Sequence, residues 1–218
     1  MINKKEMVFI LIGAVFMILT ACERHEHASP HNFPVSDMSA YEIEGEHRFY
    51  DVTMYEALQL IEDPSFDGML YFGFPTCPWC QAAVPVIHEA SQEVGVDIFY
   101  VSRRHDLRAD EWLEWDELMA WWLYEQTEDM RWIYLDETGS ETTEVTNEPL
   151  RPNIFVPHVV HVRNQTVIDQ HRGTFEGHDA PNDPGLTEEA HETLLRIYRN
   201  MFSHVGLCPV TTEVSECA

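Results

Sequence analysis

Two cysteines separated by two residues, Cys77 and Cys80, are the part of this sequence best suited to chemistry. Two thiols at this spacing can form and break a shared disulfide bond, and the same spacing also occurs in zinc sites. An apolar run at 68–74 predicts a buried strand before them, and helical spacing of apolar residues follows at 81–93. The first sulfur would then lie beside unpaired N–H groups at the positive end of a helix, which stabilises the reactive thiolate.

Strands and helices alternate along the rest of the body. The apolar pattern predicts strands over 47–52, 69–74 and 96–102, and helices over 54–61, 81–93, 110–126 and 187–202. Two later strands, 153–162 and 166–172, are joined by a tight turn and predict an antiparallel hairpin, and residues 131–150 predict a hairpin inserted before them. This order predicts an α/β domain with a central mixed sheet and helices on both of its faces.

The start of the chain indicates export. Lys4 and Lys5 precede an apolar stretch, 7–20, that is too short for a comfortable membrane span of about 20 residues. It ends in Leu19-Thr20-Ala21-Cys22, which resembles the lipobox of bacterial lipoproteins, where cleavage precedes a cysteine that carries lipid. The resemblance implies a signal peptide over 1–21, a lipidated Cys22 and a body held on the extracytoplasmic side of the cell membrane. An uncleaved anchor with an unmodified Cys22 is the alternative.

The segment 22–45 lacks sustained periodicity and contains prolines, acids and histidines, so it predicts a flexible linker between the anchor and the domain. Its histidines, His25, His27 and His31, could hold a metal weakly, but no fourth ligand is suggested nearby and we expect no metal site.

Net charge excludes one class of partner. The formal charge is −25, which argues against nucleic acid and against electrostatic adhesion to anionic lipid. Attachment to the membrane must therefore come from the lipid anchor. With 44% hydrophobic and 11% aromatic residues, the body has enough apolar side chains for one well-packed domain.

Two cysteines remain near the end of the chain. Cys208 and Cys217 lie in the tail, 205–218, and in an oxidising exterior they predict a structural disulfide that closes a small loop. A second redox-active pair is the alternative, although nothing around Cys208 resembles a strand-to-helix turn.

The sequence resembles the thioredoxin superfamily over roughly residues 46–204. Phe74-Pro-Thr-Cys-Pro-Trp-Cys80 is similar to thioredoxin-like proteins known as bacteriocin transport accessory proteins, and Thr76 to Cys80 also resembles glutaredoxins. Val156-Pro157, opening the later hairpin, matches the position of the family's cis-proline. The resemblance implies a thioredoxin fold with an inserted hairpin before the cis-proline strand, and thiol–disulfide exchange without a cofactor.

The family's roles transfer to matching positions. Cys77 would be the exposed nucleophile, and the more buried Cys80 would resolve the mixed disulfide. Pro157 would lie against both sulfurs in the cis form, and the Val156 backbone would pair with an extended substrate segment. Trp79 would offer an apolar platform to substrate, unless it is a partly exposed aromatic with no specific role.

Two positions depart from the family. Tyr71 stands where many thioredoxins have a buried aspartate that helps proton transfer from the resolving thiol, so another base, Glu89 or water, would be needed. Gly173-Thr174 stands where glutaredoxins have paired glycines, so we expect no dependence on glutathione.

Two histidines follow the expected cis-proline. His158 should approach the sulfurs, where it could favour the thiolate or ligate a metal, although a core position explains it equally well. His161 should face the other side of the strand, which argues against a two-histidine site.

Two functions from different classes fit these residues. The first is a membrane-tethered extracytoplasmic thiol–disulfide oxidoreductase that exchanges disulfides with exported proteins or with a membrane thiol electron carrier. The second is a thioredoxin-fold binding or metallochaperone module without redox turnover. Whether the pair oxidises, isomerises or reduces depends on tens of millivolts that the sequence does not set.

Overall fold

The computed structural model describes residues 32–102, 109–127, 132–135, 141–142, 151–152, 154–183 and 185–206 of the 218-residue chain. The predicted signal peptide, the predicted lipidation of Cys22 and the predicted Cys208–Cys217 disulfide lie outside the described residues. Within the described residues, no helix is both long enough and apolar enough to span a bilayer.

A five-stranded mixed sheet forms the centre of the domain, in the order β1-β3-β2-β7-β8. Three parallel strands, β1 (Phe49–Val52), β3 (Ile98–Ser102) and β2 (Asp67–Gly73), make one half. The hairpin of β7 (His158–Arg163) and β8 (Thr166–Arg172) adds antiparallel to β2. This strand order, with helices connecting the parallel strands, is the thioredoxin fold, so the expected fold class is confirmed.

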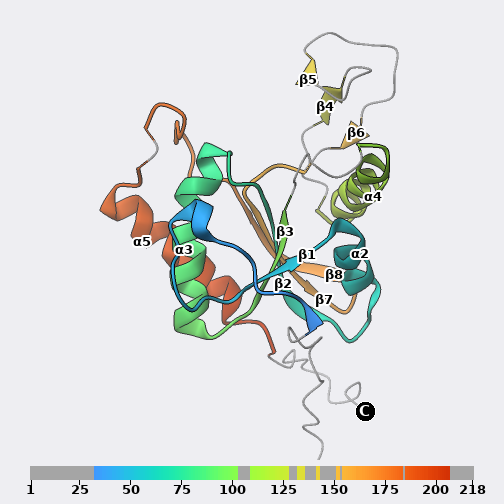
Figure 1. Cartoon of the computed structure of the whole chain (residues 1–218), viewed down its shortest axis with the longest axis horizontal. Helices are drawn as coiled ribbons and strands as arrows, with labels where there is room; N and C mark the ends of the chain where they lie inside the picture. The colour runs from blue at the N-terminus through green and yellow to red at the C-terminus, as the bar shows by residue number, and fades with distance from the viewer. Residues whose placement is uncertain are drawn as a thin grey trace, which may run out of the picture.

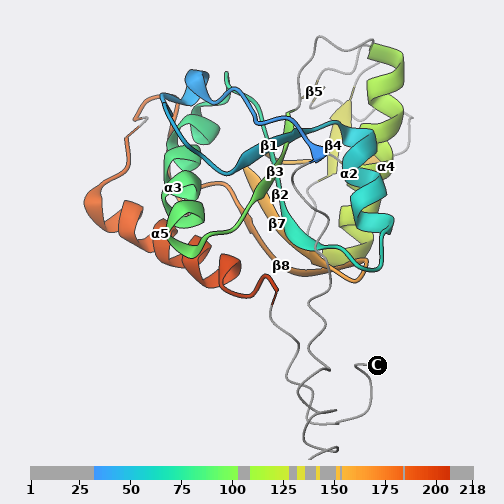
Figure 2. The same ribbon diagram turned by 60° about the horizontal axis from the view of Figure 1, so that its bottom comes forward.

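Helices cover both faces of the sheet, as the alternating pattern predicts. Helices α3 (Pro78–Val94) and α5 (Glu188–Phe202) lie side by side on one face, and α2 (Met54–Glu62) and α4 (Ala109–Thr127) lie on the other (Figures 1 and 2). The central strand β2 is buried on both faces, because alternate side chains enter different cores. Met69 and Tyr71 point to the α3 side, and Leu70 and Phe72 to the α2 side.

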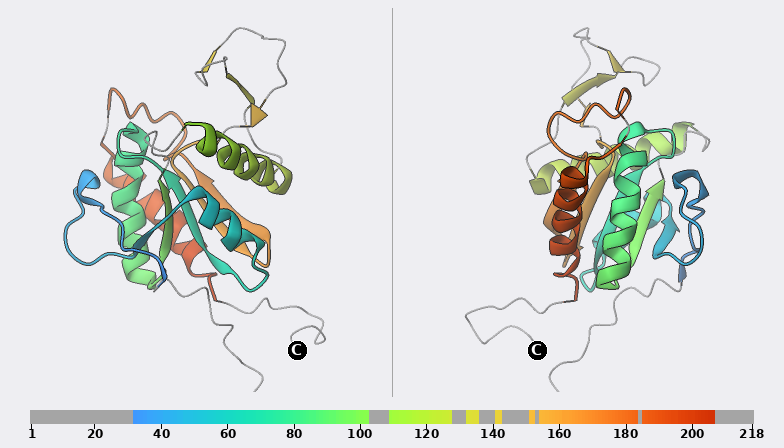
Figure 3. Two further views of the ribbon diagram at one scale, coloured as in Figure 1. Left: turned by 45° about the vertical axis from the view of Figure 1, so that its right-hand side comes forward. Right: turned by 90° about the vertical axis from the view of Figure 1, so that its left-hand side faces the viewer.

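The predicted insertion before the cis-proline strand is present as a second, smaller sheet. Strand β4 (Trp132–Leu135) pairs antiparallel with β5 (Glu141–Thr142) and with β6 (Arg151–Pro152). Figure 3 shows these three strands beyond the end of α4, apart from the five-stranded sheet. The sequence predicted the hairpin but not its third strand.

Side-chain caps fix where two of the helices begin. Thr53 accepts a hydrogen bond from the Glu56 backbone N–H, while the Glu56 carboxylate accepts one from the Thr53 N–H, so α2 begins with a capping box. Thr187 caps α5 by accepting from the Ala190 N–H, as its position before two glutamates predicts.

The linker prediction is wrong for the part of 22–45 that the structure describes. Residues 34–36 run along β1, where the Ser36 N–H donates to the Phe49 carbonyl at 3.0 Å and the Asp51 N–H donates to the Pro34 carbonyl at 2.8 Å. A short 3-10 helix, η2 (Ser39–Tyr41), follows and buries Met38 and Tyr41 beside α3. The edge strand β1 offers unpaired backbone groups, and apolar side chains in the arm supply the packing.

This arm is expected to contribute to stability. Met38 is 1% exposed, so Met38→Ala should lower the free energy of unfolding by about 2–5 kcal/mol, through lost burial and the cavity left behind. Val35, in the same arm but 62% exposed, supplies the control, because Val35→Ala should change it by less than about 0.5 kcal/mol. Urea unfolding of both variants measures the difference. Equal stability of the two variants would show that the arm is a linker after all.

Candidate active site

The two motif cysteines lie where β2 passes into α3. A turn over 74–77, closed by the Cys77 N–H donating to the Phe74 carbonyl at 3.2 Å, brings Cys77 to the N-cap position of the helix. The Cys77 sulfur accepts from the Cys80 backbone N–H at 3.4 Å. Pro78 occupies the first helical position, where a missing N–H costs nothing. The predicted placement of the first sulfur against helix N–H groups is therefore present.

Hydrogen bonds lower the pKa of Cys77 to about 7. The largest cause is a hydrogen bond with the Cys80 side chain. Burial opposes it, and the backbone N–H groups of Cys80 and Trp79 add to the lowering. Thiols ordinarily titrate near 8.5. Because the pKa of Cys77 is about 7, about half of the Cys77 side chains are thiolate at neutral pH.

Cys80 has the opposite electrostatic setting. Burial is the main cause that raises its pKa, and the hydrogen bond and negative charge of Cys77 act in the same direction. The pair therefore holds one thiolate on Cys77 while Cys80 keeps its proton. This assignment of unequal thiols agrees with the roles implied by the resemblance.

The Cys77 side chain is less exposed than the sequence predicts. Both thiols are free, but Cys77 is only 5% exposed and Cys80 is 0% exposed. Cys77 is the more accessible of the two, as expected, yet it is not the exposed nucleophile that the sequence suggested. Val156 accounts for part of this cover, because its carbonyl lies 3.9 Å from the Cys77 sulfur.

The Val156–Pro157 segment lies where the resemblance places it. The Val156–Pro157 peptide bond is cis, as expected for the family position. The Pro157 carbonyl accepts from the Gly173 N–H at 2.8 Å, which ties the segment to the end of β8. Val156 and Cys77 are 79 residues apart in sequence and adjacent in space, so the two halves of the predicted site come together.

Trp79 is held by a loop that sequence reasoning did not connect with the site. Its indole N–H donates to the His178 carbonyl at 3.0 Å. His178 is itself fixed by the Thr174 hydroxyl at 2.6 Å and by stacking on the Phe175 ring with centroids 4.7 Å apart. Trp79 therefore has a defined orientation in the fold, and its role as a substrate platform stays a prediction. The loop after β8 borders the redox site and leaves Phe175 exposed.

His158 does not approach the sulfurs. It is buried on the other face of the sheet, where its ring contacts Phe72 and its Nε2 lies 2.8 Å from the Gln170 amide oxygen. The alternation of β7 explains this, since its neighbour Val159 packs on the α3 side. His161 faces away from His158, as predicted, and pairs with Asp67 at 2.7 Å.

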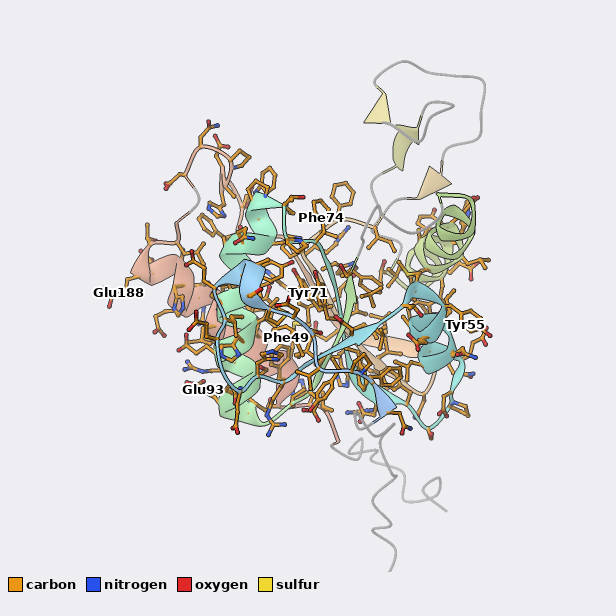
Figure 4. The ribbon with its side chains drawn as sticks, viewed as in Figure 1. Phe49, Tyr55, Tyr71, Phe74, Glu93 and Glu188 are labelled. Atoms are coloured by element: carbon orange, nitrogen blue, oxygen red, sulfur yellow. The ribbon has the colours of Figure 1, made fainter. Side chains whose placement is uncertain are left out.

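Glu89, the base suggested for Cys80, is also elsewhere. It lies at the surface of α3 and pairs with His191 of α5 at 3.2 Å. Tyr71 instead lies on the α3 side of the sheet, between Phe74 and Phe49 in the view of Figure 4. Its hydroxyl is fully buried and close enough to Cys80 for each group to act on the pKa of the other.

The part of the chain that the structure describes offers no metal centre to the pair. No group of three or more histidine, cysteine or acidic side chains gathers there in a way that could hold an ion.

The electrostatic difference between the sulfurs predicts a pH profile. Alkylation of Cys77 by iodoacetamide should rise with pH and reach half its maximum near pH 7, because only the thiolate reacts. In Cys80→Ala the main hydrogen bond to Cys77 is lost, so the midpoint should move up toward about 8.5. Mass spectrometry of the labelled peptide gives both rates. An ordinary thiol midpoint in the unchanged protein would contradict the site geometry.

Comparison of the sequence with known proteins finds no matching protein-family model and no matching curated protein. Among solved structures, the chain is similar to a thioredoxin from Aeropyrum pernix, with 22% sequence identity and a TM-score of 0.33. That match covers 57% of this chain and 74% of the thioredoxin. The fold assignment itself comes from the strand order and connections described above.

Proposed function

We propose that this protein is a thiol–disulfide oxidoreductase that works through Cys77 and Cys80. The observation that carries the proposal is the unequal pair of free thiols at the start of α3, with the pKa of Cys77 lowered to about 7 and that of Cys80 raised by burial. A thiolate is the attacking species in disulfide exchange, and a protonated partner one turn behind is protected from premature reaction.

The reaction proceeds in two exchanges. The Cys77 thiolate attacks one sulfur of a substrate disulfide, forms a mixed disulfide and releases the other substrate sulfur as a thiolate. Cys80 then loses its proton and attacks the Cys77 sulfur, which forms the Cys77–Cys80 disulfide and releases the second substrate sulfur. Two electrons pass from the protein to the substrate. In the opposite direction the same steps oxidise a substrate dithiol.

Three features form the substrate-binding surface in this proposal. The Val156 backbone, adjacent to the Cys77 sulfur, offers hydrogen-bonding groups to an extended peptide, in the manner of an added strand. Trp79, oriented by the His178 carbonyl, provides an apolar wall. The exposed Phe175 ring extends that wall along the loop after β8. Exposed aromatic and backbone groups of this kind suit a range of unfolded or extended protein substrates.

The protein is proposed to act outside the cytoplasm, attached to the membrane through lipid on Cys22. The basic start of the chain, the short apolar stretch and Leu19 to Cys22 support this location. Its partners would then be exported proteins with thiols or disulfides. A membrane thiol electron carrier would return Cys77 and Cys80 to their starting redox state after each turnover. Disulfides persist in such compartments, which suits a redox-active cysteine pair.

Single cysteine substitutions test the redox function. Cys80→Ser should accumulate mixed disulfides with substrate proteins, because the resolving attack is lost, whereas Cys77→Ser should form none. Non-reducing electrophoresis before and after reductant detects the adducts. Both variants should lose all turnover in a disulfide-reduction assay. A protein that keeps its partner through both substitutions is a binding or metallochaperone module, and the oxidoreductase proposal is then wrong.

A substitution of Cys22 tests the location. Cys22→Ser should move the protein from the membrane fraction to the soluble exported fraction or leave its signal peptide uncleaved, and it should abolish incorporation of labelled fatty acid. Cys208→Ser, which removes a thiol outside the proposed lipidation sequence, is the matched control and should leave both unchanged. An unchanged protein that incorporates no fatty acid and keeps its signal peptide would favour an uncleaved N-terminal anchor.

A further inference from the structure

The attack by Cys80 that resolves the mixed disulfide needs a group that accepts the Cys80 proton. Cys80 must lose a proton before it can attack, yet it is 0% exposed and burial raises its pKa. A thioredoxin-like carboxylate is absent at position 71, and Glu89 lies at the surface in a pair with His191. The core behind Cys80 must therefore supply another route for the proton.

Three polar side chains occupy adjacent register positions across the sheet and form a row on the face toward Cys80. The strand register places Tyr71 of β2 directly beside Tyr100 of β3, and Tyr100 directly beside Asp51 of the edge strand β1. Tyr71 and Tyr100 face α3, and Asp51, two positions after Phe49, falls on the same face by strand alternation. The two tyrosine rings are stacked, with centroids 5.2 Å apart and planes 20° from parallel. The row thus joins the buried centre of the sheet to its half-buried edge.

The neighbourhood of the row is shaped around the tyrosine hydroxyls. A Cβ atom at Gly73 would collide with the Tyr71 hydroxyl, so the glycine leaves room for that group at the end of β2. Tyr41, from the arm before β1, places its hydroxyl 3.1 Å from the hydroxyl of Tyr100. Both Tyr41 and Tyr100 are almost completely buried, so this pair of hydroxyl groups lies inside an apolar core.

We propose that Tyr71 and Tyr100, braced by Tyr41, carry the Cys80 proton across the sheet to Asp51 during the resolving step. This inference rests on the proposed oxidoreductase function and assigns the proton-transfer residues of the same site. The carboxylate that a thioredoxin-like core would place beside the thiol is, in this chain, at the sheet edge, and the tyrosines connect it to Cys80.

Neutral tyrosine suits this role because its hydroxyl accepts one hydrogen bond while donating another. Burial raises the pKa of Tyr71 well above its ordinary range, and burial likewise raises the pKa of Tyr100, to which the charges of Cys80 and Asp51 also contribute. Neither tyrosine therefore remains ionised as a phenolate. Each hydroxyl must donate one proton as it accepts another. Asp51, half-buried at the edge, can take the proton and release it to water.

The other titratable groups around the row are few. Tyr198 of α5 is fully buried in the same core, where burial and, to a smaller extent, the charge of Cys80 raise its pKa, but it lies outside the strand register that forms the row. His47, before β1, is close enough to Asp51 for that charge to raise its pKa, although burial is the larger effect and lowers it. Tyr198 is therefore the natural control for a lost hydroxyl.

The atoms and electrons of the step balance without another reactant. The Cys80 S–H bond breaks, its proton leaves through Tyr71, and the Cys80 electron pair forms the bond to the Cys77 sulfur. The bond from Cys77 to the substrate sulfur breaks, and the substrate departs as a thiolate. The proton released at Asp51 enters solvent, where it is available to that thiolate.

A two-phase reaction separates this step from the first exchange. The reduced full-length protein is mixed with a small aromatic disulfide, whose coloured thiolate is released once when Cys77 attacks and again when Cys80 resolves the adduct. In Tyr71→Phe, the first phase should stay within about twofold. The second phase should slow about tenfold or more at neutral pH, since positioned proton transfer contributes at least that much.

Two further variants make the test specific. Asp51→Asn should also slow the second phase, and in both variants its rate should rise steeply with pH, because hydroxide must replace the lost path. Tyr198→Phe removes a buried hydroxyl from the same core and should leave both phases and their pH profile unchanged. Urea unfolding confirms that each variant is folded.

Each outcome has a defined meaning. A slowed second phase in Tyr71→Phe and Asp51→Asn but not in Tyr198→Phe supports the row. An unchanged second phase in folded Tyr71→Phe, or equal slowing in Tyr198→Phe, overturns it and leaves the oxidoreductase function intact. Absence of both phases in the unchanged protein refutes the oxidoreductase function itself.

Discussion

The arrangement that sets the thiol and the backbone N–H of Cys80 against the Cys77 sulfur is the constraint on which the site depends. It forms because β2 ends in a four-residue turn and α3 begins at once, so Cys77 takes the N-cap position and Cys80 lies one turn inside. The same geometry separates the two thiols electrically. The cap position favours negative charge on the first sulfur, while the apolar core of the sheet keeps the second neutral.

The separation makes Cys77 the attacking sulfur, and it also hinders the ionisation of Cys80. A buried thiol is protected from outside reagents, but the burial that protects it also opposes its ionisation. Large aromatic side chains fill the core behind Cys80, and several of them carry hydroxyl groups rather than being purely apolar. The core thus contains hydroxyl groups where apolar side chains would pack equally well. Burying a hydroxyl group costs free energy of folding, and a role in the reaction would explain why these groups are present.

The sequence predicted the elements better than their contacts. Local periodicity placed α2, α3 and α5 within a few residues, and the helix-start position of Cys77 followed from the motif alone. The packing of Met38 on α3, the face on which His158 lies and the bond from Trp79 to the His178 carbonyl all depend on long-range register. A one-residue change in strand register reverses the face of every side chain, so these contacts could not be derived from spacing.

The placement of the chain ends bears on which partners can reach the site. The Gly206 N–H donates to Asp67 at the start of β2, so the described C-terminal end lies at the amino end of the parallel strands. The cysteines follow the carboxyl end of β2, about 20 Å from the start of this seven-residue strand. The described C-terminal end therefore lies away from the surface that a disulfide substrate must reach.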